Sequence, residues 1–387
     1  CMSSTAMAEW HISRRTWEES DMAEITLKSL AHSYSKNPAT AQDYAIREMN
    51  HVWHQGGAYA LLGPSGCGKS TMLNIISGLL EPSNGEVLFD GKVVNSLPPE
   101  ERNIAQVFQF PVIYDTMTVY DNLAFPLRNM KTPEARVHER VMEVADVLEL
   151  TPQLKRKAKN LNADEKQKVS MGRGLVRDDV SAILFDEPLT VIDPQLKWKL
   201  RRKLKEIHHR FRITMVYVTH DQLEASTFAD KIAVMYEGQV VQFGTPRELF
   251  ETPNHTFVGY FIGSPGMNFL DVTVRDGKVF SGEAPLLVDK RVHDGIARAT
   301  SDNVKLGIRP EFIEVHQKPV EDGMEVKVEH AQDLGTYSIV YASLGGISLK
   351  ARVEEDQITP VDKAWLRFPS EKIGLYVDDF RVELPHE

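Results

Sequence analysis

Residues 63–71 have the sequence Gly-Pro-Ser-Gly-Cys-Gly-Lys-Ser-Thr, which few folds can accommodate. Two glycines five positions apart, followed by a lysine and a hydroxyl residue, fill every fixed position of the phosphate-loop pattern. In this pattern the glycines let backbone N–H groups turn inward around a polyphosphate, the lysine reaches the terminal phosphates, and the first hydroxyl is a Mg²⁺ ligand. The residues of the predicted phosphate site, with Ser70 also a metal ligand, are Gly63, Pro64, Ser65, Gly66, Cys67, Gly68, Lys69, Ser70 and Thr71.

The segments on either side of this loop have the order that the pattern requires. Residues 58–62 are a short apolar run suited to a buried strand, and residues 72–80 are predicted to form a helix that Glu81-Pro82 closes. A bound phosphate would lie at the N-terminus of that helix, where unpaired N–H groups and the helix dipole favour anions. The alternative is a glycine-rich turn that matches by coincidence, and the strand, loop and helix order argues against it.

A second apolar run, residues 181–185, ends in Asp186-Glu187-Pro188. In phosphoryl transfer the protein contributes mainly by positioning the reacting groups and neutralising their charge. We therefore expect Asp186 to hold the Mg²⁺ and its waters and Glu187 to polarise the attacking water, the alternative being an ordinary turn. Residues 213–218 form another predicted buried strand, and His220 follows it at the strand end where parallel sheets bind ligands. We expect His220 to hydrogen-bond the terminal phosphate, although a structural histidine is the alternative.

Two further positions are candidates for nucleotide contact. Residues 25–31 alternate like a strand, and Tyr34 follows them, where it would stack on an adenine ring. The alternative is an aromatic residue at an ordinary strand end, because aromatics are common in strands. Residues 104–108 form a predicted buried strand with Gln109 at its end. An aromatic, proline-containing segment runs from there to Pro126.

The remaining elements of the N-terminal part follow from periodicity. We expect a strand over residues 44–53, a hairpin of residues 85–89 and 92–94 around Asp90-Gly91, and helices over residues 134–150, 162–176 and 195–211, with Pro152 ending the first of these. The last helix places Leu196, Leu200, Leu204, Ile207 and Phe211 on one face and Lys and Arg on the other. Such a basic stripe could touch nucleic acid, but a solvated helix face is the more common explanation.

The chain changes character at residue 244. Several prolines and glycines predict a linker with one short helix, and short strands then follow over residues 269–274, 304–308, 325–329, 338–341, 347–353 and 364–368. That regular spacing is typical of a small β-barrel of the oligomer-binding (OB) kind. We therefore expect three parts: residues 1–24 as a disordered extension or an artefact, residues 25–243 as the nucleotide-binding domain, and residues 244–387 as linker and β-barrel.

Composition limits the partners and the compartment. At 387 residues and a net charge of −10, the chain has room for two or three domains and no general affinity for nucleic acid or anionic lipid. No apolar run approaches the roughly 18 residues of a membrane span. Its two cysteines, Cys1 and Cys67, give no disulfide framework, which fits a reducing cytoplasmic setting, and residues 1–20 lack the apolar core of a signal peptide.

Five features in one order, namely Tyr34, residues 63–71, Gln109, Asp186-Glu187 with Asp193, and His220, resemble the nucleotide-binding subunit of an ABC transporter. Residues 261–269 and 306–311 look like the regulatory domain of bacterial ATPases that serve maltose-type and glycerol-phosphate-type importers. The resemblance covers about residues 25–380. It implies an α/β fold, a P-loop NTPase of the ABC type followed by a small all-β, OB-like regulatory domain.

The same resemblance implies an ATPase that binds ATP and Mg²⁺ and powers import of a sugar, polyol or glycerol-type solute. Gln109 would contact the nucleotide and its Mg²⁺, and with the aromatic segment after it would form the groove for a coupling helix. The implied partners are a second ATPase subunit, two membrane-spanning permease subunits and an extracytoplasmic solute-binding protein, with no nucleic acid. The implied location is the cytoplasmic face of the bacterial inner membrane, as a peripheral subunit.

One motif departs from that family. Its signature is Leu-Ser-Gly-Gly-Gln at a helix N-terminus, which touches the ATP of the opposite subunit, whereas residues 161–165 here are Leu-Asn-Ala-Asp-Glu. Asn162 and Glu165 form a capping-box pattern, so the helix should still start there. Asp164, however, replaces a glycine with an anion at the phosphate position. Like charges about 4 Å apart cost about 4 kcal/mol at an effective dielectric near 20. We therefore expect a heterodimer with a different ATPase.

Two other function classes stay open on the sequence alone. A soluble ABC-type ATPase acting on ribosomes or DNA would also carry these motifs, but there is one phosphate loop, no long heptad insertion and an acidic charge. A non-hydrolysing regulatory half is the other class, and the intact Lys69, Ser70, Asp186, Glu187 and His220 argue against it.

Overall fold

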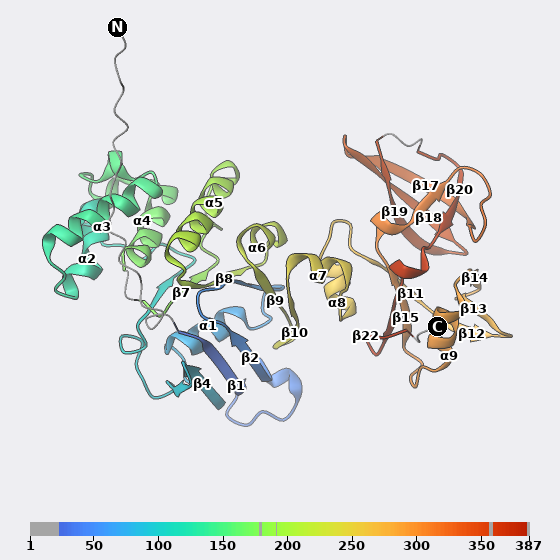
Figure 1. Ribbon diagram of the computed structural model, residues 1–387, viewed down its shortest axis with the longest axis horizontal. Coiled ribbons are helices and arrows are strands. Elements are labelled where there is room, and N and C mark those ends of the chain that lie inside the picture. The colour runs from blue at the N-terminus through green and yellow to red at the C-terminus, as the bar shows by residue number, and fades with distance from the viewer. Residues whose placement is uncertain (1–22, 178–179, 191, 356–358, 385–387) are drawn as a thin grey trace, which may run out of the picture.

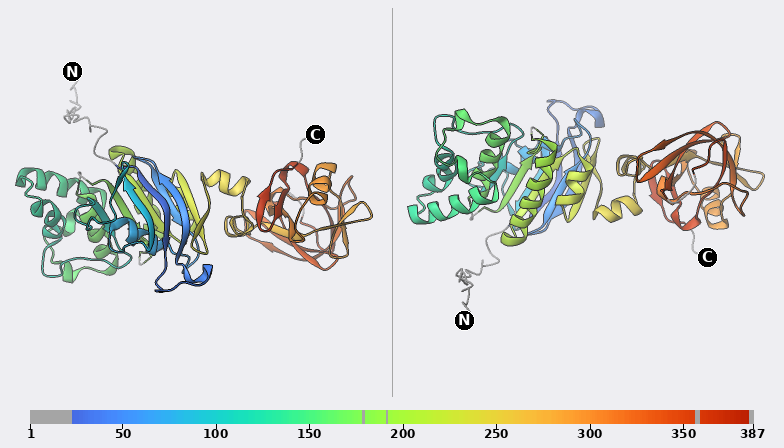
Figure 2. Two further views of the ribbon diagram at one scale, coloured as in Figure 1. Left: turned by 90° about the horizontal axis from the view of Figure 1, so that it is seen from below. Right: turned by 90° about the horizontal axis from the view of Figure 1, so that it is seen from above.

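The computed structural model describes residues 23–177, 180–190, 192–355 and 359–384. An N-terminal α/β part and a C-terminal β-rich part lie at opposite ends of the molecule, and two short helices lie between them (Figure 1). Figure 2 shows the same arrangement from two further sides. Almost all of the predicted N-terminal extension, including Cys1, lies outside the described residues.

Two sheets form the centre of the N-terminal part. The first is antiparallel, in the order β2-β1-β4-β5, with β1 Ile25–His32, β2 Ile46–Trp53, β4 Asn84–Phe89 and β5 Lys92–Val93. The second has the order β10-β9-β3-β8-β7-β6, with β3 Ala58–Leu62, β6 Ile104–Val107, β7 Ala182–Asp186, β8 Thr214–Thr219, β9 Lys231–Tyr236 and β10 Gln239–Gly244. Its strands are parallel except for β10. This confirms the predicted α/β fold.

The apolar faces of the helices cover both sides of the second sheet. Helix α1 (Lys69–Ser77) lies between the two sheets, and its Met72 and Ile75 share a buried cluster with Leu61 of β3. Helices α5 (Pro194–Phe211) and α6 (Gln222–Phe228) cover the other face, with Leu204 and Phe228 in a cluster that includes strand residues of the sheet. The predicted apolar stripe of α5 is thus buried, while the side chain of Phe211 lies outside the described atoms.

A helical layer extends from the end of the sheet next to β6 (Figure 1). It contains α2 (Val119–Asn129), α3 (Glu134–Val147) and α4 (Ala163–Leu175), with short 3₁₀ turns at Ala41–Asp43, Thr151–Gln153 and Ala158–Asn160 elsewhere in the N-terminal part. The buried guanidinium of Arg140 in α3 donates to the carbonyl oxygens of Leu175 and Val176, which fixes α3 against the end of α4. Such carbonyls have no partner within their own helix.

The C-terminal part begins with α7 (Pro246–Glu251) and α8 (Thr256–Phe261), where one short helix was predicted. Its three sheets have the orders β11-β15-β21-β22, β12-β13-β14 and β16-β20-β17-β18-β19, and they enclose one apolar cluster. The elements are β11 Asn268–Asp271, β12 Thr273–Arg275, β13 Lys278–Ser281, β14 Ala284–Leu286, α9 Lys290–Ala297, β15 Val304–Ile308, β16 Glu314–His316, β17 Met324–Asp333, β18 Tyr337–Leu344, β19 Ile347–Glu354, β20 Lys363–Arg367, β21 Gly374–Val377 and β22 Phe380–Val382, with 3₁₀ turns at Pro310–Phe312 and Ser370–Lys372.

Several predicted boundaries were wrong, each for a local reason. Helix α1 covers residues 69–77 rather than 72–80, because Gly68 and Gly78 both adopt positive φ and cap its two ends. Helix α3 ends at Val147 rather than continuing to residue 150, because Glu149 has a φ of 57°, which is not helical. The helix therefore stops before Pro152 is reached. The predicted strand over residues 269–274 is two strands, β11 and β12, which belong to different sheets.

Candidate functional site

Four parallel strands end at one edge of the second sheet, and the candidate residues follow them there. The register pairs Leu62 of β3 with Thr219 of β8, Val218 of β8 with Asp186 of β7, and Phe185 of β7 with Val107 of β6. The phosphate loop, His220, Glu187 and Gln109 therefore leave the sheet at the same edge, where open α/β sheets bind ligands.

The phosphate loop requires its glycines for steric reasons. A Cβ on Gly63 would lie 2.4 Å from the carbonyl oxygen of Met235, and a Cβ on Gly68 would lie 2.3 Å from that of Ala45. Gly68 also has a φ of 102°, a region that L side chains rarely adopt. The backbone at Gly63 and Gly68 thus carries no side chain where the loop leads into α1, and the first N–H groups of a helix are donors for an anion.

Lys69 lies inside the loop rather than on its surface. Its side chain is almost fully buried, and its ammonium donates to the carbonyl oxygens of Gly63 (2.9 Å) and Pro64 (2.8 Å). The thiol of Cys67 is buried beside it, 3.9 Å away, and burial raises the pKa of this thiol. Cys67 is therefore a packing residue, because a thiol that stays protonated is a poor nucleophile.

The structure brings Ser70 and Asp186, two of the predicted metal ligands, into contact. The Ser70 hydroxyl donates to Oδ1 of Asp186 at 3.1 Å, although the two residues lie far apart in sequence. Burial raises the pKa of Asp186, and the Ser70 hydrogen bond opposes that shift. Two oxygen ligands side by side fit Mg²⁺, which usually takes one or two protein oxygens and completes its shell with phosphate and water. Among the described residues no three His, Cys, Asp or Glu side chains gather to hold a metal by themselves.

Glu187 and His220 form the second pair at this edge. Oε2 of Glu187 lies 3.1 Å from Nδ1 of His220, and the backbone N–H of Glu187 donates to the carbonyl oxygen of Val218. Glu187 has a φ of 45°, which is uncommon for a residue with a side chain and occurs at functional sites. The Thr190 hydroxyl donates to the Glu187 carbonyl oxygen at 3.1 Å and holds this turn. A carboxylate and an imidazole thus lie together beside the phosphate loop, as acid–base chemistry on a bound phosphate requires.

The structure brings Tyr34 to the loop as well. The ring is 68% exposed, and its hydroxyl lies 3.2 Å from Oγ1 of Thr71, so a flat apolar face stands open to solvent beside the loop. Gln109 is at the expected edge but, within the described structure, does not hydrogen-bond Ser70 or Asp186. The neighbouring carbonyl oxygen of Phe108 accepts from Nε2 of buried Gln167 in α4 at 3.1 Å. This link from the helical layer to the Gln109 segment had no signal in the sequence.

The altered signature begins α4, as its capping box predicted. Asn162 Oδ1 accepts from the backbone N–H of Glu165 at 2.8 Å, and Glu165 Oε2 accepts from that of Asn162 at 3.0 Å. Arg156 also donates to Glu165, at 3.2 Å. The Glu165 carboxylate is therefore held by the fold, and the helix start is intact.

Asp164 has a different environment. Its carboxylate is 3.7 Å from the ammonium of Lys168, one turn later, and burial raises the pKa of this carboxyl group. Oδ1 is buried and has no hydrogen-bond partner among the described residues. Lys168 was missed at the sequence level, although the i,i+4 spacing that predicts such pairs was present. Lys168 offsets part of the Asp164 charge, but an unpaired carboxylate oxygen remains at the first turn of the helix.

Comparison with known proteins agrees with this geometry. Residues 46–190 match the ABC transporter family, residues 263–313 match the MalK OB fold domain, and residues 306–375 match the TOBE domain. A solved structure of cbiO1 from Clostridium perfringens, part of the ABC transporter complex cbiONQ, aligns with a TM-score of 0.53 and 28% identity over 59% of this chain and 90% of that one.

Two relatives that align over most of the chain indicate which type of ABC transporter protein it is. The chain is 40% identical to the sn-glycerol-3-phosphate import ATP-binding protein of Psychromonas ingrahamii, covering 87% of this chain and 86% of the relative. It is 43% identical to the trehalose/maltose import ATP-binding protein of Thermococcus litoralis, covering 79% and 85%. These names favour the importer interpretation over an ATPase acting on ribosomes or DNA. The chain belongs to the ABC transporter ATP-binding proteins of the maltose and glycerol-3-phosphate import type.

Proposed function

We propose that this chain is the ATP-hydrolysing half of a heterodimeric ATPase pair in an ABC importer. In this proposal its own phosphate loop, Asp186, Glu187 and His220 form the working site, which the signature of a different ATPase completes. The observation that carries the proposal is the contrast between that full set of reactive side chains and the Asp164 carboxylate at the start of α4.

Each side chain of the proposed site has a separate task. Lys69 and the loop amides hold the ATP phosphates, and Ser70 and Asp186 hold Mg²⁺, which when bound neutralises phosphate charge. Gln109, two residues after the end of β6, would be a further ligand of that metal. The 3.1 Å contact between Ser70 and Asp186 and the steric need for glycine at Gly63 and Gly68 support these assignments.

The reactive step depends on two further residues. Glu187 takes a proton from the attacking water, and His220 donates a hydrogen bond to the terminal phosphate. The 3.1 Å contact between them supports this division, because one atom pair orients both groups. Tyr34 stacks on the adenine, which its 68% exposed ring beside Thr71 supports.

The test is an asymmetry between the two ATPases of the assembled transporter. Affinity purification of this chain with its membrane subunits, followed by mass spectrometry, should find a second, non-identical ATPase. In the reconstituted complex Glu187→Gln should lower transport and ATPase activity by at least a hundredfold, within the range for a lost acid–base group. The equivalent change in the partner should lower both activities much less. Glu149→Gln, a control at an exposed position outside the proposed site, should leave both unchanged.

Two results would contradict the proposal. Equal losses from the two glutamate substitutions would mean that both sites turn over. Brisk, cooperative hydrolysis by this chain alone would mean that its own signature works.

The transported solute and the cellular location are proposed from the family alone. We propose a sugar, polyol or glycerol-type solute, because the relatives named above are import proteins for glycerol 3-phosphate and for trehalose or maltose. We place the subunit at the cytoplasmic face of the bacterial inner membrane, with two permease subunits and an extracytoplasmic binding protein. None of the helices in the described part of the chain has the length and hydropathy to span a bilayer. Uptake assays with labelled solutes in a deletion strain test the cargo.

A further inference from the structure

Gln222, the first residue of α6, connects the nucleotide site to the end of α8. Its side-chain amide donates to the carbonyl oxygen of Phe261 and accepts from the backbone N–H of Gly263, the latter at 2.9 Å. Gln222 lies two residues after His220 and has no part in the nucleotide site described above. Two hydrogen bonds therefore join the start of α6 to residues 261–263.

Arg309, which directly follows β15, holds the same segment from the C-terminal part. Its buried guanidinium donates to the carbonyl oxygen of Ile262 at 2.5 Å, between the two residues that Gln222 contacts. Gly263 has a φ of 106°, and a Cβ there would lie 2.8 Å from Nη1 of Arg309, so this close approach requires a glycine. Three consecutive residues thus link the C-terminal part to the start of α6.

The turn between β8 and α6 is a compact unit, so a shift of Gln222 also moves His220. Asp221 caps α6 by accepting from two backbone N–H groups of the first turn, at 2.8 and 3.1 Å. The Thr219 hydroxyl accepts from the N–H of Asp221 at 3.0 Å and donates to Glu224 at 2.9 Å. The His220 side chain itself is 56% exposed. Its position therefore depends on the backbone of this turn.

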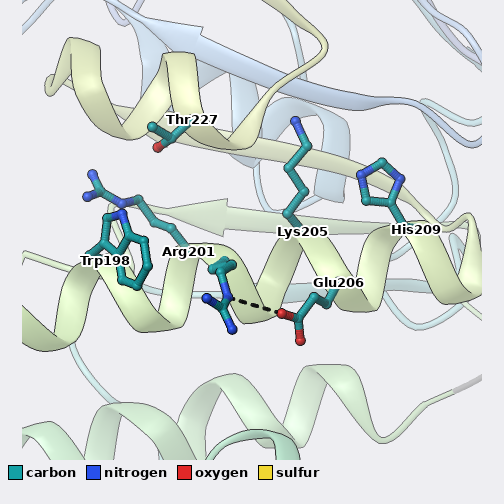
Figure 3. Close-up of a pocket in the computed structure, with 7 residues that line it drawn as sticks. Trp198, Arg201, Lys205, Glu206, His209 and Thr227 are labelled. Carbon is teal, nitrogen blue, oxygen red and sulfur yellow. Dashed lines mark hydrogen bonds and ion pairs between the residues drawn. The ribbon is translucent and has the colours of Figure 1, made fainter.

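The packing of α6 leaves its orientation partly free. Ala225 and Phe228 are fully buried and hold the helix to the sheet. On the side toward α5, however, Thr227 and residues of α5, among them Trp198, line a hollow of about 300 Å³ (Figure 3). Space beside a helix of only seven residues allows it to tilt, because atoms on that side lack packing partners. The Gln222 hydrogen bonds therefore help to fix the first turn.

A second glutamine holds the linker that contains α7 and α8 in the same manner. The Gln242 amide, on β10, donates to the carbonyl oxygen of Thr252 at 3.1 Å and accepts from the N–H of Asn254 at 2.8 Å. Each glutamine thus bridges a carbonyl group and the N–H two residues later. Strand β10 is at the edge of the second sheet, so of these two glutamines only Gln222 adjoins the nucleotide site.

We propose that Gln222 is a positioning residue for ATP hydrolysis: with Arg309, it makes the position of His220 depend on the C-terminal part. This inference rests on the proposed contact of His220 with the terminal phosphate. A change in the C-terminal part that moves residues 261–263 alters the rate of the hydrolytic step, while the phosphate loop and its hold on ATP stay unchanged.

The test compares two matched substitutions in the reconstituted transporter. Gln222→Met and Gln242→Met each remove two hydrogen bonds to the linker and keep the length of the side chain. Gln222→Met should lower kcat for ATP about tenfold, the usual effect of losing one or two hydrogen bonds, and leave KM unchanged. Gln242→Met should leave both constants unchanged. Arg309→Lys should also lower kcat, and combined with Gln222→Met it should add little, because both act on one segment.

His220→Ala separates this inference from the function on which it rests. If His220→Ala leaves kcat unchanged, the proposed role of His220 is wrong, and the inference fails with it. If His220→Ala lowers kcat and Gln222→Met does not, only the role of Gln222 is wrong. Equal losses of kcat in Gln222→Met and Gln242→Met, or a rise in KM alone, would also contradict the inference. The Gln222 comparison remains decisive if Arg309→Lys does not fold, because Gln222 is only partly buried.

Discussion

Replacing Asp164 should make this chain pair with itself on ATP. In such a pair the Asp164 carboxylate would face the terminal phosphate of the nucleotide held by the other copy. At about 4 Å and an effective dielectric near 20 the repulsion is about 4 kcal/mol. Lys168 lies 3.7 Å from Asp164. If it stood beyond Asp164, at roughly 8 Å from the phosphate, it would return about 2 kcal/mol. The net penalty is about 2 kcal/mol, or about thirtyfold in affinity. Asp164→Gly removes it.

The assay is ATP-driven dimerisation of the purified chain. Glu187→Gln serves as the background because it should prevent hydrolysis and trap the closed pair. The dimer midpoint, measured by light scattering against ATP concentration, should fall about thirtyfold in Asp164→Gly and nearly as far in Asp164→Asn, which keeps the size and removes the charge. Lys168→Ala should act in the opposite direction. Lys166→Ala, whose ammonium pairs with Asp115 at 3.1 Å, is the matched control on the same helix.

The two Asp164 variants distinguish charge from bulk as the cause of the penalty. A gain in Asp164→Gly with none in Asp164→Asn would show that bulk, not charge, blocks the contact. No gain in either variant would show that the Asp164 carboxylate does not face a phosphate, and the electrostatic reasoning would be refuted. Dimerisation of the unmodified signature at micromolar ATP would refute the heterodimer as well.

Two further predictions concern the connection between the N- and C-terminal parts. The guanidinium of Arg309 is buried, and burial lowers its pKa to about 10. It donates to carbonyl oxygens of Phe250 in α7 and Gly259 in α8, and to that of Ile262, which follows α8, at 2.5 Å. Arg309→Lys should therefore lower the free energy of unfolding by about 2–3 kcal/mol, measured by urea denaturation. The hydrogen bond from Lys305 holds the pKa of Asp379 below its usual value, so its stabilisation is complete above about pH 4 and is lost as the pH falls through the lowered pKa. Asp379→Asn should accordingly lower the urea midpoint at pH 7 and have progressively less effect below about pH 4; a constant difference would contradict this.

Features that depend on a few neighbouring residues could be predicted from the sequence. Asp90 and Gly91 both have positive φ, as the predicted tight hairpin turn requires, because few other dipeptides tolerate that backbone. The start of α4 followed from Asn162 and Glu165 alone, since a capping box is satisfied within four residues.

Features set by tertiary contact could not be predicted in the same way. Helix α2 contains Pro126, which argues against a helix locally, yet buried Leu123 and Leu127 pack into the apolar cluster and stabilise it. The strands β9 and β10 have a polar turn and short apolar runs, and they join the sheet only because β9 pairs with β3 and β10 pairs with β9. Motif order gave the candidate site residues, but the Ser70–Asp186 and Glu187–His220 contacts depend on the parallel register.

The surroundings of Asp164 show that α4 can fold without this residue, so its effect on the proposed contact with a nucleotide can be tested separately. Asn162, Glu165 and Arg156 satisfy the first turn without Asp164, and one carboxylate oxygen of Asp164 has no partner among the described residues. Since burial raises the pKa of this carboxyl group, its ionised form is less favourable in the folded protein than in water. The helix therefore does not depend on Asp164. A change in ATP-driven dimerisation after substitution at this position would consequently report on the surface proposed to meet a partner's nucleotide, and not on loss of the helix that presents it.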